Sequence, residues 1–404
     1  MKKLHYSLLF LLCFFAACDK SNEIKDPVPV QDVAAIAQMT SDFGWKLFQE
    51  VAEGVTDENV LISPLSVQTA FSMAANGANG MTLEEILTVM GCESCDVKDL
   101  NTQTAQLRVL MEEQSGHPRL VSANGFFYDP DRVEVRESFI QTLTDDYRAG
   151  FEQHNFSDPA TIDNINNWVK DNTAGKIDKI IDDIDGLDLA FLINALHFKA
   201  DWASGFGDQT YPGMFTSAEN TQVSVDYVSA DKNYSTAQRQ KFNMVDLPFK
   251  DSTYTLSLVQ PVDALADQSD WVLQLTATEL KDMWTNLSYG RAQVRFPKLE
   301  LEYDEELKDP LERLGIIDAF SEGKADFSNL GTALIGPVIY ISKVRHKAVL
   351  KVDEKGAEGA AVTSVGFSTT SAPPQFAFDK PFVIVLRHTA TNTILFAGLI
   401  NDPS

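Results

Sequence analysis

The order of helical and strand-like segments constrains the fold of this 404-residue chain more than any single motif does. Apolar residues recur three and four positions apart in segments 33–51, 66–89, 101–113, 136–146 and 305–314, which predicts helices. The strand-like segments are 120–128, 190–198, 242–248, 254–259, 292–301, 382–386 and 394–399. The last two flank a short polar turn and predict a hairpin. Helices and strands mix without the regular alternation of a doubly wound sheet, which predicts an α+β fold with several sheets.

Size and charge narrow the class of protein. A length of 404 residues and a hydrophobic content of 44% allow one large domain or two ordinary ones, with enough apolar material for a buried core. Between residues 37 and 404 we find neither an internal repeat nor a linker rich in Pro, Gly or Ser. With 58 acidic and 33 basic side chains, the net charge of -25 argues against a nucleic-acid binder, because phosphate neutralisation needs clustered Lys and Arg. The acidity predicts a well-solvated, self-repelling surface.

The first residues predict an export signal. Two lysines precede an apolar run at 8–15 that is too short to span a bilayer, so residues 1–17 are interpreted as a cleaved signal peptide. The run ends in Phe15-Ala16-Ala17-Cys18, which resembles a bacterial lipobox, with Phe15 where the pattern prefers Leu. This resemblance implies lipidation of Cys18. The alternative is an ordinary signal peptide cut after Ala17.

Residues 18–36 are polar, contain two prolines and are interpreted as a tether. The predicted protein is exported and lipid-anchored to the cell envelope, on the periplasmic or surface face of the outer membrane. The lipid would then be its only membrane contact. Secretion without an anchor is the alternative localisation.

Cys92 and Cys95 form a lone C-x-x-C. The pair follows a helical segment and Gly91, whereas a redox dithiol is expected at a helix N-terminus in a βαβ unit. Three interpretations stay open: a local structural disulfide, which an oxidising compartment favours, two incidental thiols, or a redox pair. A zinc site would need a second pair, so no metal is expected.

One stretch does not fit a packed domain. Residues 354–374 are rich in small side chains, poor in charge and closed by Pro373-Pro374, which forbids helix and central strand. Long loops of this kind in compact domains are usually functional or disordered. An exposed, extended segment with small side chains is also what a protease active site accepts.

Taken together, several motifs resemble the serpin family over nearly the whole chain from residue 37. They are NVLISPLS at 59–66, INNWV at 165–169 followed by Thr173 and GKI at 175–177, NALHFKADW at 194–202, FPK at 296–298, LGI at 314–316 with AF at 319–320, DKPF at 379–382 and FAG at 396–398. The resemblance implies a single domain at 37–404 with three β-sheets, about eight or nine helices and an exposed reactive loop at about 354–374.

The resemblance also assigns roles to polar residues. Ser63, Ser66, Asn194 and His346 resemble the family's polar cluster beneath the centre of the main sheet, and Trp202 stands where the loop first enters that sheet. The same four residues are also what a purely structural, fully hydrogen-bonded polar network in the core would contain. A catalytic Ser and His pair is the rival interpretation, but no G-x-S-x-G elbow is present, so we expect no enzyme activity.

The resemblance implies suicide inhibition of a protease. The protease cuts the loop, forms an acyl-enzyme and is trapped when the first part of the loop inserts as a new strand. Insertion requires small side chains in the hinge, which comprises Glu354, Gly356, Ala357, Gly359, Ala360 and Ala361. Alternation along a strand puts Glu358 on the face opposite Ala357 and Gly359, toward solvent. A non-inhibitory binding protein of the same family is the alternative.

Family loop length places the reactive bond between Thr370 and Ser371, and a slipped register would place it between Phe367 and Ser368. No Lys or Arg lies between Gly356 and Asp379, which disfavours trypsin-like targets. Thr370 suits elastase-like or subtilisin-like serine proteases, with a papain-like cysteine protease as a further option. The expected partner is a covalently bound target protease, the expected state is a monomer, and no cofactor is expected.

Overall fold

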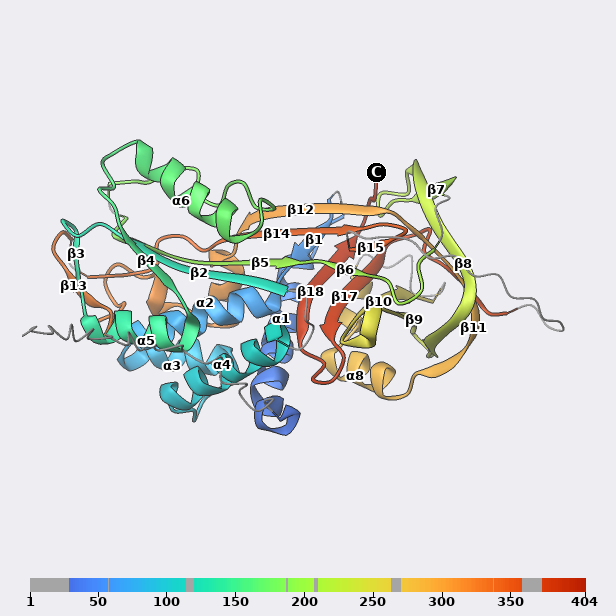
Figure 1. The fold of residues 1–404 in the computed structure, drawn as a ribbon, viewed down its shortest axis with the longest axis horizontal. Helices are drawn as coiled ribbons and strands as arrows, with labels where there is room; N and C mark the ends of the chain where they lie inside the picture. The colour runs from blue at the N-terminus through green and yellow to red at the C-terminus, as the bar shows by residue number, and fades with distance from the viewer. Residues whose placement is uncertain are drawn as a thin grey trace, which may run out of the picture.

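A computed structural model describes residues 29–56, 58–113, 120–186, 188–206, 210–262, 270–336, 338–357 and 373–404. The molecule is elongated, with most helices gathered toward one end and long strands running between the ends (Figure 1). The α-helices within the described residues are α1 (Ala34–Ala52), α2 (Pro64–Gly77), α3 (Gly80–Val89), α4 (Val97–Glu113), α5 (Glu137–Tyr147), α6 (Ala160–Asn172), α8 (Ala277–Thr285) and α9 (Lys308–Leu314). The short 3₁₀ turns are η1 (Val30–Val33), η2 (Lys250–Ser252), η3 (Trp271–Gln274) and η4 (Asp318–Phe320).

The largest sheet has nine strands in the order β1-β18-β17-β10-β9-β8-β11-β16, with β7 paired to β8. Their bounds are β1 (Val60–Ile62), β18 (Ile394–Ile400), β17 (Phe382–His388), β10 (Tyr254–Pro261), β9 (Phe242–Pro248), β8 (Gln222–Gln238), β11 (Ser288–Pro297), β16 (Gln375–Ala377) and β7 (Tyr211–Thr216). The 17-residue β8 pairs with β9 near one end and with β7 near the other, so it joins β7 to the rest of this sheet.

A second layer runs along the molecule and is divided. One half is β4-β2-β5 and the other is β12-β14. The β15-β6 pair lies where β5 and β14 end, which we call the top of the layer, and β13-β3 lies at the helical end (Figure 1). The bounds are β4 (Gly150–Gln153), β2 (Leu120–Tyr128), β5 (Ala190–Phe198), β12 (Leu299–Glu306), β14 (Arg345–Val352), β15 (Gly356–Ala357), β6 (Ala200–Asp201), β13 (Gly331–Ala333) and β3 (Val133–Val135). Strands β5 and β14 lie side by side (Figure 1), yet no hydrogen-bonded ladder joins them within the described residues.

Helix α2 lies at the centre of the molecule because its sequence is apolar or small on nearly every side. A helix that is hydrophobic all round must be buried, and α2 packs between β5 on one side and β18 on the other. Its first turn is fixed by Pro64 at the start and by the Ser63 side chain, which accepts a hydrogen bond from the Ser66 amide. The helix therefore forms a rigid floor beneath the divided layer.

The structure confirms the α+β fold and corrects one boundary. Residues 30–36, predicted to end the tether, lie in η1 and α1. Val33 and Ile36 are buried in the core, at 0% and 2% exposure. The predicted boundary at residue 36 is therefore wrong, because apolar side chains already join the domain before it.

Close contact between α1 and α2 gives a stability prediction. A Cβ on Gly44 would lie 2.0 Å from Cβ of Pro64, far inside van der Waals contact. We expect Gly44→Ala to destabilise the native state by about 1–3 kcal/mol, because overpacking moves both helices. The urea midpoint measures this. Gly290→Ala is the control, since nothing lies within 4 Å of that position, and equal midpoints for both variants would contradict the prediction.

Candidate functional site

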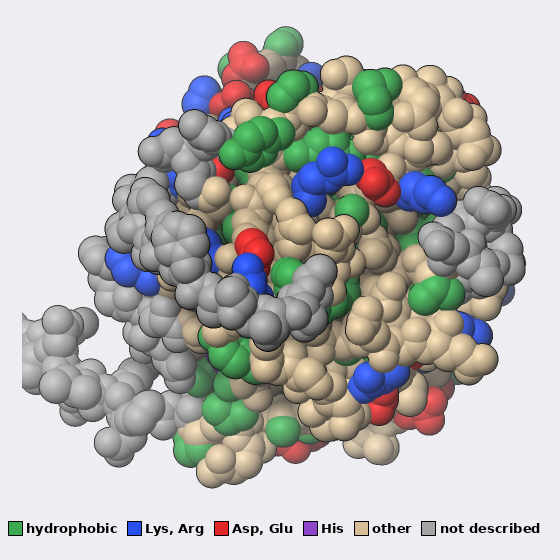
Figure 2. All heavy atoms as spheres, turned by 90° about the vertical axis from the view of Figure 1, so that its right-hand side faces the viewer, with side chains coloured by type: hydrophobic (Ala, Val, Ile, Leu, Met, Phe, Trp, Pro, Cys, Tyr) green, Lys and Arg blue, Asp and Glu red, His purple; other side chains and the backbone are tan. Residues whose placement is uncertain are grey.

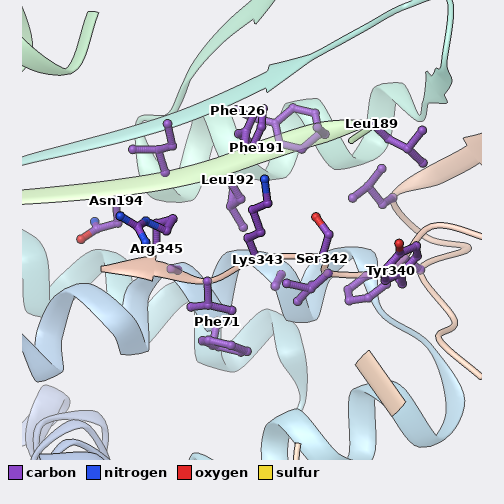
Figure 3. Close-up of a pocket in the computed structure, with 18 of the residues that line it drawn as sticks. Phe71, Phe126, Leu189, Phe191, Leu192, Asn194, Tyr340, Ser342, Lys343 and Arg345 are labelled. Carbon is purple, nitrogen blue, oxygen red and sulfur yellow. The ribbon is translucent and has the colours of Figure 1, made fainter. Parts of the chain in front are cut away.

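A cavity lies where the divided layer is open. Its volume is about 170 Å³, and its walls come from β5, from residues 339–346 leading into β14, and from α2. Figure 3 shows Leu192 and Asn194 of β5 on one side and Lys343 and Arg345 on the other, with Phe71 of α2 below. Most of the lining is aliphatic or aromatic. The cavity therefore has the character of unfinished core between two strand edges.

The structure brings Ser63, Ser66, Asn194 and His346 together at one end of this cavity. The Ser63 amide donates to Nε2 of His346 at 3.1 Å, and the Ser66 hydroxyl donates to the Asn194 carbonyl at 3.4 Å. Asn194 in turn donates to Oδ1 of Asn124 on β2 at 2.5 Å. Hydrogen bonds therefore link α2 to both halves of the layer, through β5 and through β14.

Burial keeps His346 neutral. The side chain is 5% exposed, and desolvation lowers the pKa of His346 to about 4. Since Nε2 accepts the Ser63 amide proton, protonation of Nε2 would break that hydrogen bond.

Ser63 and His346 do not form a nucleophile and base. The Ser63 hydroxyl donates to the Leu395 carbonyl at 2.7 Å, and it is the Ser63 backbone amide that contacts the imidazole. An activated serine needs its hydroxyl within hydrogen-bond reach of the base. Both side chains are buried as well, so this pair is structural.

The start of the loop is fixed at the top of the layer. The Trp202 indole donates to the Asp353 carbonyl at 2.9 Å, and its ring stacks on Phe249 at 4.4 Å between centroids. Lys298 Nζ lies 2.8 Å from the Glu354 carboxylate. Burial raises the pKa of Glu354, but the hydrogen bond from Lys298 and the nearby positive charges outweigh it and lower that pKa below its usual value.

Two of the hinge residues already form a strand. Gly356 pairs with Asp201 and Ala357 with Ala200, so β15 runs antiparallel to β6. Strand β6 continues the line of β5 after Lys199. From Gly356 to Ala357, β15 therefore runs in the direction that leads back along β5, toward the cavity.

Comparisons with known proteins identify the fold and the family. Residues 38–403 match the family model described as serpin (serine protease inhibitor).

The chain belongs to the serpin family.

It is 30% identical to human serpin B8, over 91% of this chain and 99% of the relative. Among solved structures, the native state of the thermophilic serpin tengpin is 30% identical, with a TM-score of 0.83 over 91% of this chain and 94% of that chain. The latent state of tengpin has a TM-score of 0.78 at 28% identity, over 91% of this chain and 98% of that chain. The serpin fold predicted from the motifs is confirmed.

Several predicted site residues lie outside the described part of this serpin. They are Cys18, Gly359, Ala360, Ala361, Phe367, Ser368, Thr370 and Ser371. Their assigned roles stay predictions.

The structure joins Cys92 and Cys95 as a disulfide with a Cα–Cα distance of 5.2 Å. The pair follows α3, after Gly91 in the left-handed region at φ 81°. Cys92 is buried at 4% exposure. The bond therefore closes a tight turn between α3 and α4.

Two further absences are limited to the described residues. No group of three or more His, Cys, Asp or Glu side chains there is arranged to hold a metal ion. Nor does any helix there have the length and hydropathy needed to cross a membrane.

Sequence reasoning missed Asn124 and the Asp353 carbonyl. Asn124 is a buried amide inside the otherwise apolar or small run of β2. An amide side chain in such a strand predicts a buried hydrogen-bonding cluster, because a buried amide requires hydrogen-bond partners. The Asp353 carbonyl is a backbone group, and side-chain patterns do not reveal backbone acceptors.

The neutral state of His346 gives a pH prediction. Between its ordinary pKa of 6.5 and about 4, the unfolded chain binds a proton at this site and the native state does not. The free energy of unfolding therefore decreases as pH falls through this window, and His346 accounts for about 3 kcal/mol of that decrease. Above the window His346 makes stability neither rise nor fall with pH.

His346→Gln removes the titration and retains an acceptor for the Ser63 amide. Its urea midpoint should fall less than that of the wild type between neutral pH and pH ~4. Parallel midpoint curves for the two proteins would contradict a neutral, buried His346.

Proposed function

We propose that this serpin inhibits proteases by suicide trapping. The target nucleophile attacks the carbonyl carbon of the residue before the cut bond, and the following residue leaves as a new amino terminus. The loop segment after Ala357 then inserts between β5 and β14. The bound protease is carried away before its acyl bond to the loop is hydrolysed.

One observation carries this proposal: β15 lies antiparallel to β6 at the end of a gap between β5 and β14, two strands that no ladder joins in the described part of the chain. Extending β15 by the same pairing would place each following residue beside β5. The inserted segment would have β14 as its second neighbour. In this proposal Gly356 and Ala357 are the first two residues of the inserted strand.

The energy for trapping would come from completing the layer. Each new backbone hydrogen bond contributes about 1 kcal/mol net, and apolar burial adds about 25 cal/mol per Å². The hinge residues after Ala357 are small, which suits passage between parting strands. In this proposal the native state is kinetically trapped rather than the most stable state.

The comparison with tengpin supports a loop that is not yet inserted. This chain has the higher TM-score with native tengpin, at 0.83, and the lower with latent tengpin, at 0.78. This difference fits the state from which trapping starts.

Target choice is proposed to rest on the loop. Figure 2 views the molecule from the right-hand side of Figure 1, where hydrophobic side chains are scattered over the visible described surface rather than gathered in one patch. Exposed Arg291 of β11 is paired with Asp231 of β8 at 2.8 Å. With no Lys or Arg between Gly356 and Asp379, the proposed targets are elastase-like or subtilisin-like proteases cutting at Thr370-Ser371, or chymotrypsin-like proteases cutting at Phe367-Ser368.

Localisation is part of the proposal. Residues 1–17 as a signal peptide and a lipid on Cys18 would export the protein and anchor it to the envelope, with secretion as the alternative. The described domain begins by Val30, which shortens the proposed tether to about 18–29. We propose that the inhibitor acts as a monomer and has no catalytic activity of its own.

A protease assay tests the mechanism. Incubation with an elastase-like protease should produce a covalent complex that survives denaturing electrophoresis, with loss of protease activity. The control uses the same protease with its catalytic nucleophile chemically blocked, which should form no covalent complex. Cleavage of the loop by a protease that stays fully active would overturn the proposal.

A substitution at the reactive bond tests target choice. Thr370→Arg should raise the rate of complex formation with a trypsin-like protease on the order of 100-fold or more, because the acidic specificity pocket of that protease gains a basic side chain to bind. Thr370→Val is the matched control and should leave trypsin-like proteases uninhibited. If both variants behave as the wild type, residue 370 does not precede the cut bond.

A further inference from the structure

Charged side chains bridge the gap that the backbone leaves open. The chain between α6 and β5 carries Asp182, Asp183, Asp185 and Asp188, which we call the acidic connector. None of residues 181–186 belongs to a helix or strand. Facing it are residues 342–345, which lead into β14.

Lys343 is the centre of the contact. Its Nζ lies 2.6 Å from Oδ2 of Asp183, 3.7 Å from Asp185 and 3.8 Å from Asp188. In the view of Figure 3, the side chains of Lys343 and Ser342 point from this segment toward β5. One ammonium group thus contacts three carboxylates on the other side of the gap.

The residues on either side of Lys343 and Val344 add to the contact. The Ser342 hydroxyl donates to Oδ1 of Asp188 at 2.9 Å. Arg345 Nη2 lies 3.2 Å from Asp182 and 2.9 Å from Asp304 of β12. Three of the four residues at 342–345 therefore hold the acidic connector.

The acidic connector is fixed to the β2 and β5 half of the layer. Arg132, which lies between β2 and β3, donates to the carbonyls of Asp185 and Asp188 at 3.0 and 2.9 Å. The Asp185 amide also donates to the Asp188 carboxylate at 2.9 Å. The carboxylates thus belong to one half of the layer and the cations to the other.

Opening the gap must disturb these contacts. A further strand needs a spacing of about 4.8 Å from each neighbour. Ion pairs of 2.6 to 3.8 Å do not stretch by such an amount, so they must break, or the acidic connector must leave Arg132.

The ion pairs of Lys343 differ in how far they are shielded from water, so dissolved salt weakens some of them more than others. The Asp188 side chain is 0% exposed and that of Lys343 is 29% exposed, whereas Asp183 is 68% exposed. Burial lowers the pKa of Lys343, but the hydrogen bond to Asp183 and the neighbouring carboxylates outweigh it and raise that pKa above its usual value. Dissolved ions screen the more exposed pairs first.

We propose that the acidic connector and residues 342–345 form an electrostatic latch that limits how fast the gap between β5 and β14 opens. This inference rests on the proposed function, because opening matters only if the loop inserts there. Breaking the latch shortens the lifetime of the active native state, and ionic strength regulates that lifetime.

The test measures spontaneous conversion of the intact protein to its inserted, heat-resistant form at a fixed elevated temperature and low ionic strength. Lys343→Met keeps the aliphatic stem and removes the charge, and we expect conversion about 3- to 10-fold faster. Asp183→Asn should accelerate it less, because Lys343 keeps two carboxylates. The double variant, with Lys343→Met and Asp183→Asn combined, should convert no faster than Lys343→Met alone, since both substitutions remove the same ion pair between Lys343 and Asp183.

Lys351→Met is the matched control. Lys351 lies on β14 and pairs at 3.2 Å with Glu300 of β12, within one half of the layer. Its removal changes the net charge equally and should leave the conversion rate unchanged. Added salt should accelerate the wild type and have less effect on Lys343→Met.

The outcomes separate the latch from the mechanism. If loop cleavage of the wild type gives no rise in thermal stability, insertion itself fails and the proposed function with it. If cleavage raises stability but Lys343→Met and Lys351→Met convert at the same rate, only the latch is overturned. If Lys343→Met does not fold, the salt series on the wild type and Asp183→Asn decide the matter, and a rate insensitive to both overturns the latch.

Discussion

The rest of the structure depends on a missing set of backbone hydrogen bonds. In the described residues β5 and β14 lie side by side without a ladder, although buried backbone groups normally find partners. Each surrounding feature closes one side of this gap. Helix α2 is the floor, the polar cluster around Ser63 and His346 joins floor to strands, and β15 with Trp202 stands at the top.

The lining of the gap is largely apolar, but the hydrogen bonds and ion pairs that cross it can be exchanged when strands separate. Interlocked apolar side chains would have to be pulled apart at the full cost of their burial. Hydrogen bonds such as Ser66 to the Asn194 carbonyl, and ion pairs such as Lys343 to Asp183, can instead be exchanged for others as strands move. The structure thus combines a rigid core, built on α2 and the nine-stranded sheet, with one seam that can part.

Much of the fold could be predicted from sequence because it follows local patterns. The segments 120–128, 190–198 and 242–248 coincide with β2, β5 and β9. The predicted helix 66–89 is two helices, α2 and α3, because Gly80 adopts φ 52° where the chain turns. The predicted strand 292–301 is divided after Pro297, whose nitrogen cannot donate to a ladder. Strand β8 was not predicted, since polar residues fill most of its length.

The site was only partly predictable, for a different reason. The motifs identified Ser63, Asn194, His346 and Trp202, and the structure brings the first three into one cluster. Nothing local to Asp183 or Lys343 indicates that they meet, because 160 positions separate them in the chain. Contacts between distant charges follow from the assembled fold, and a charge count cannot assign their partners.

The divided layer also bears on how copies of this protein behave toward each other. Unpaired strand edges are templates for association, and proteins normally protect them by covering or by charge. Here two such edges face each other inside one molecule, with α2 beneath and the acidic chain before β5 beside them. A net charge of -25 adds repulsion between molecules. Colloidal stability and the capacity to accept a strand thus draw on the same acidic residues, so a change that frees the seam also exposes a surface on which chains can join.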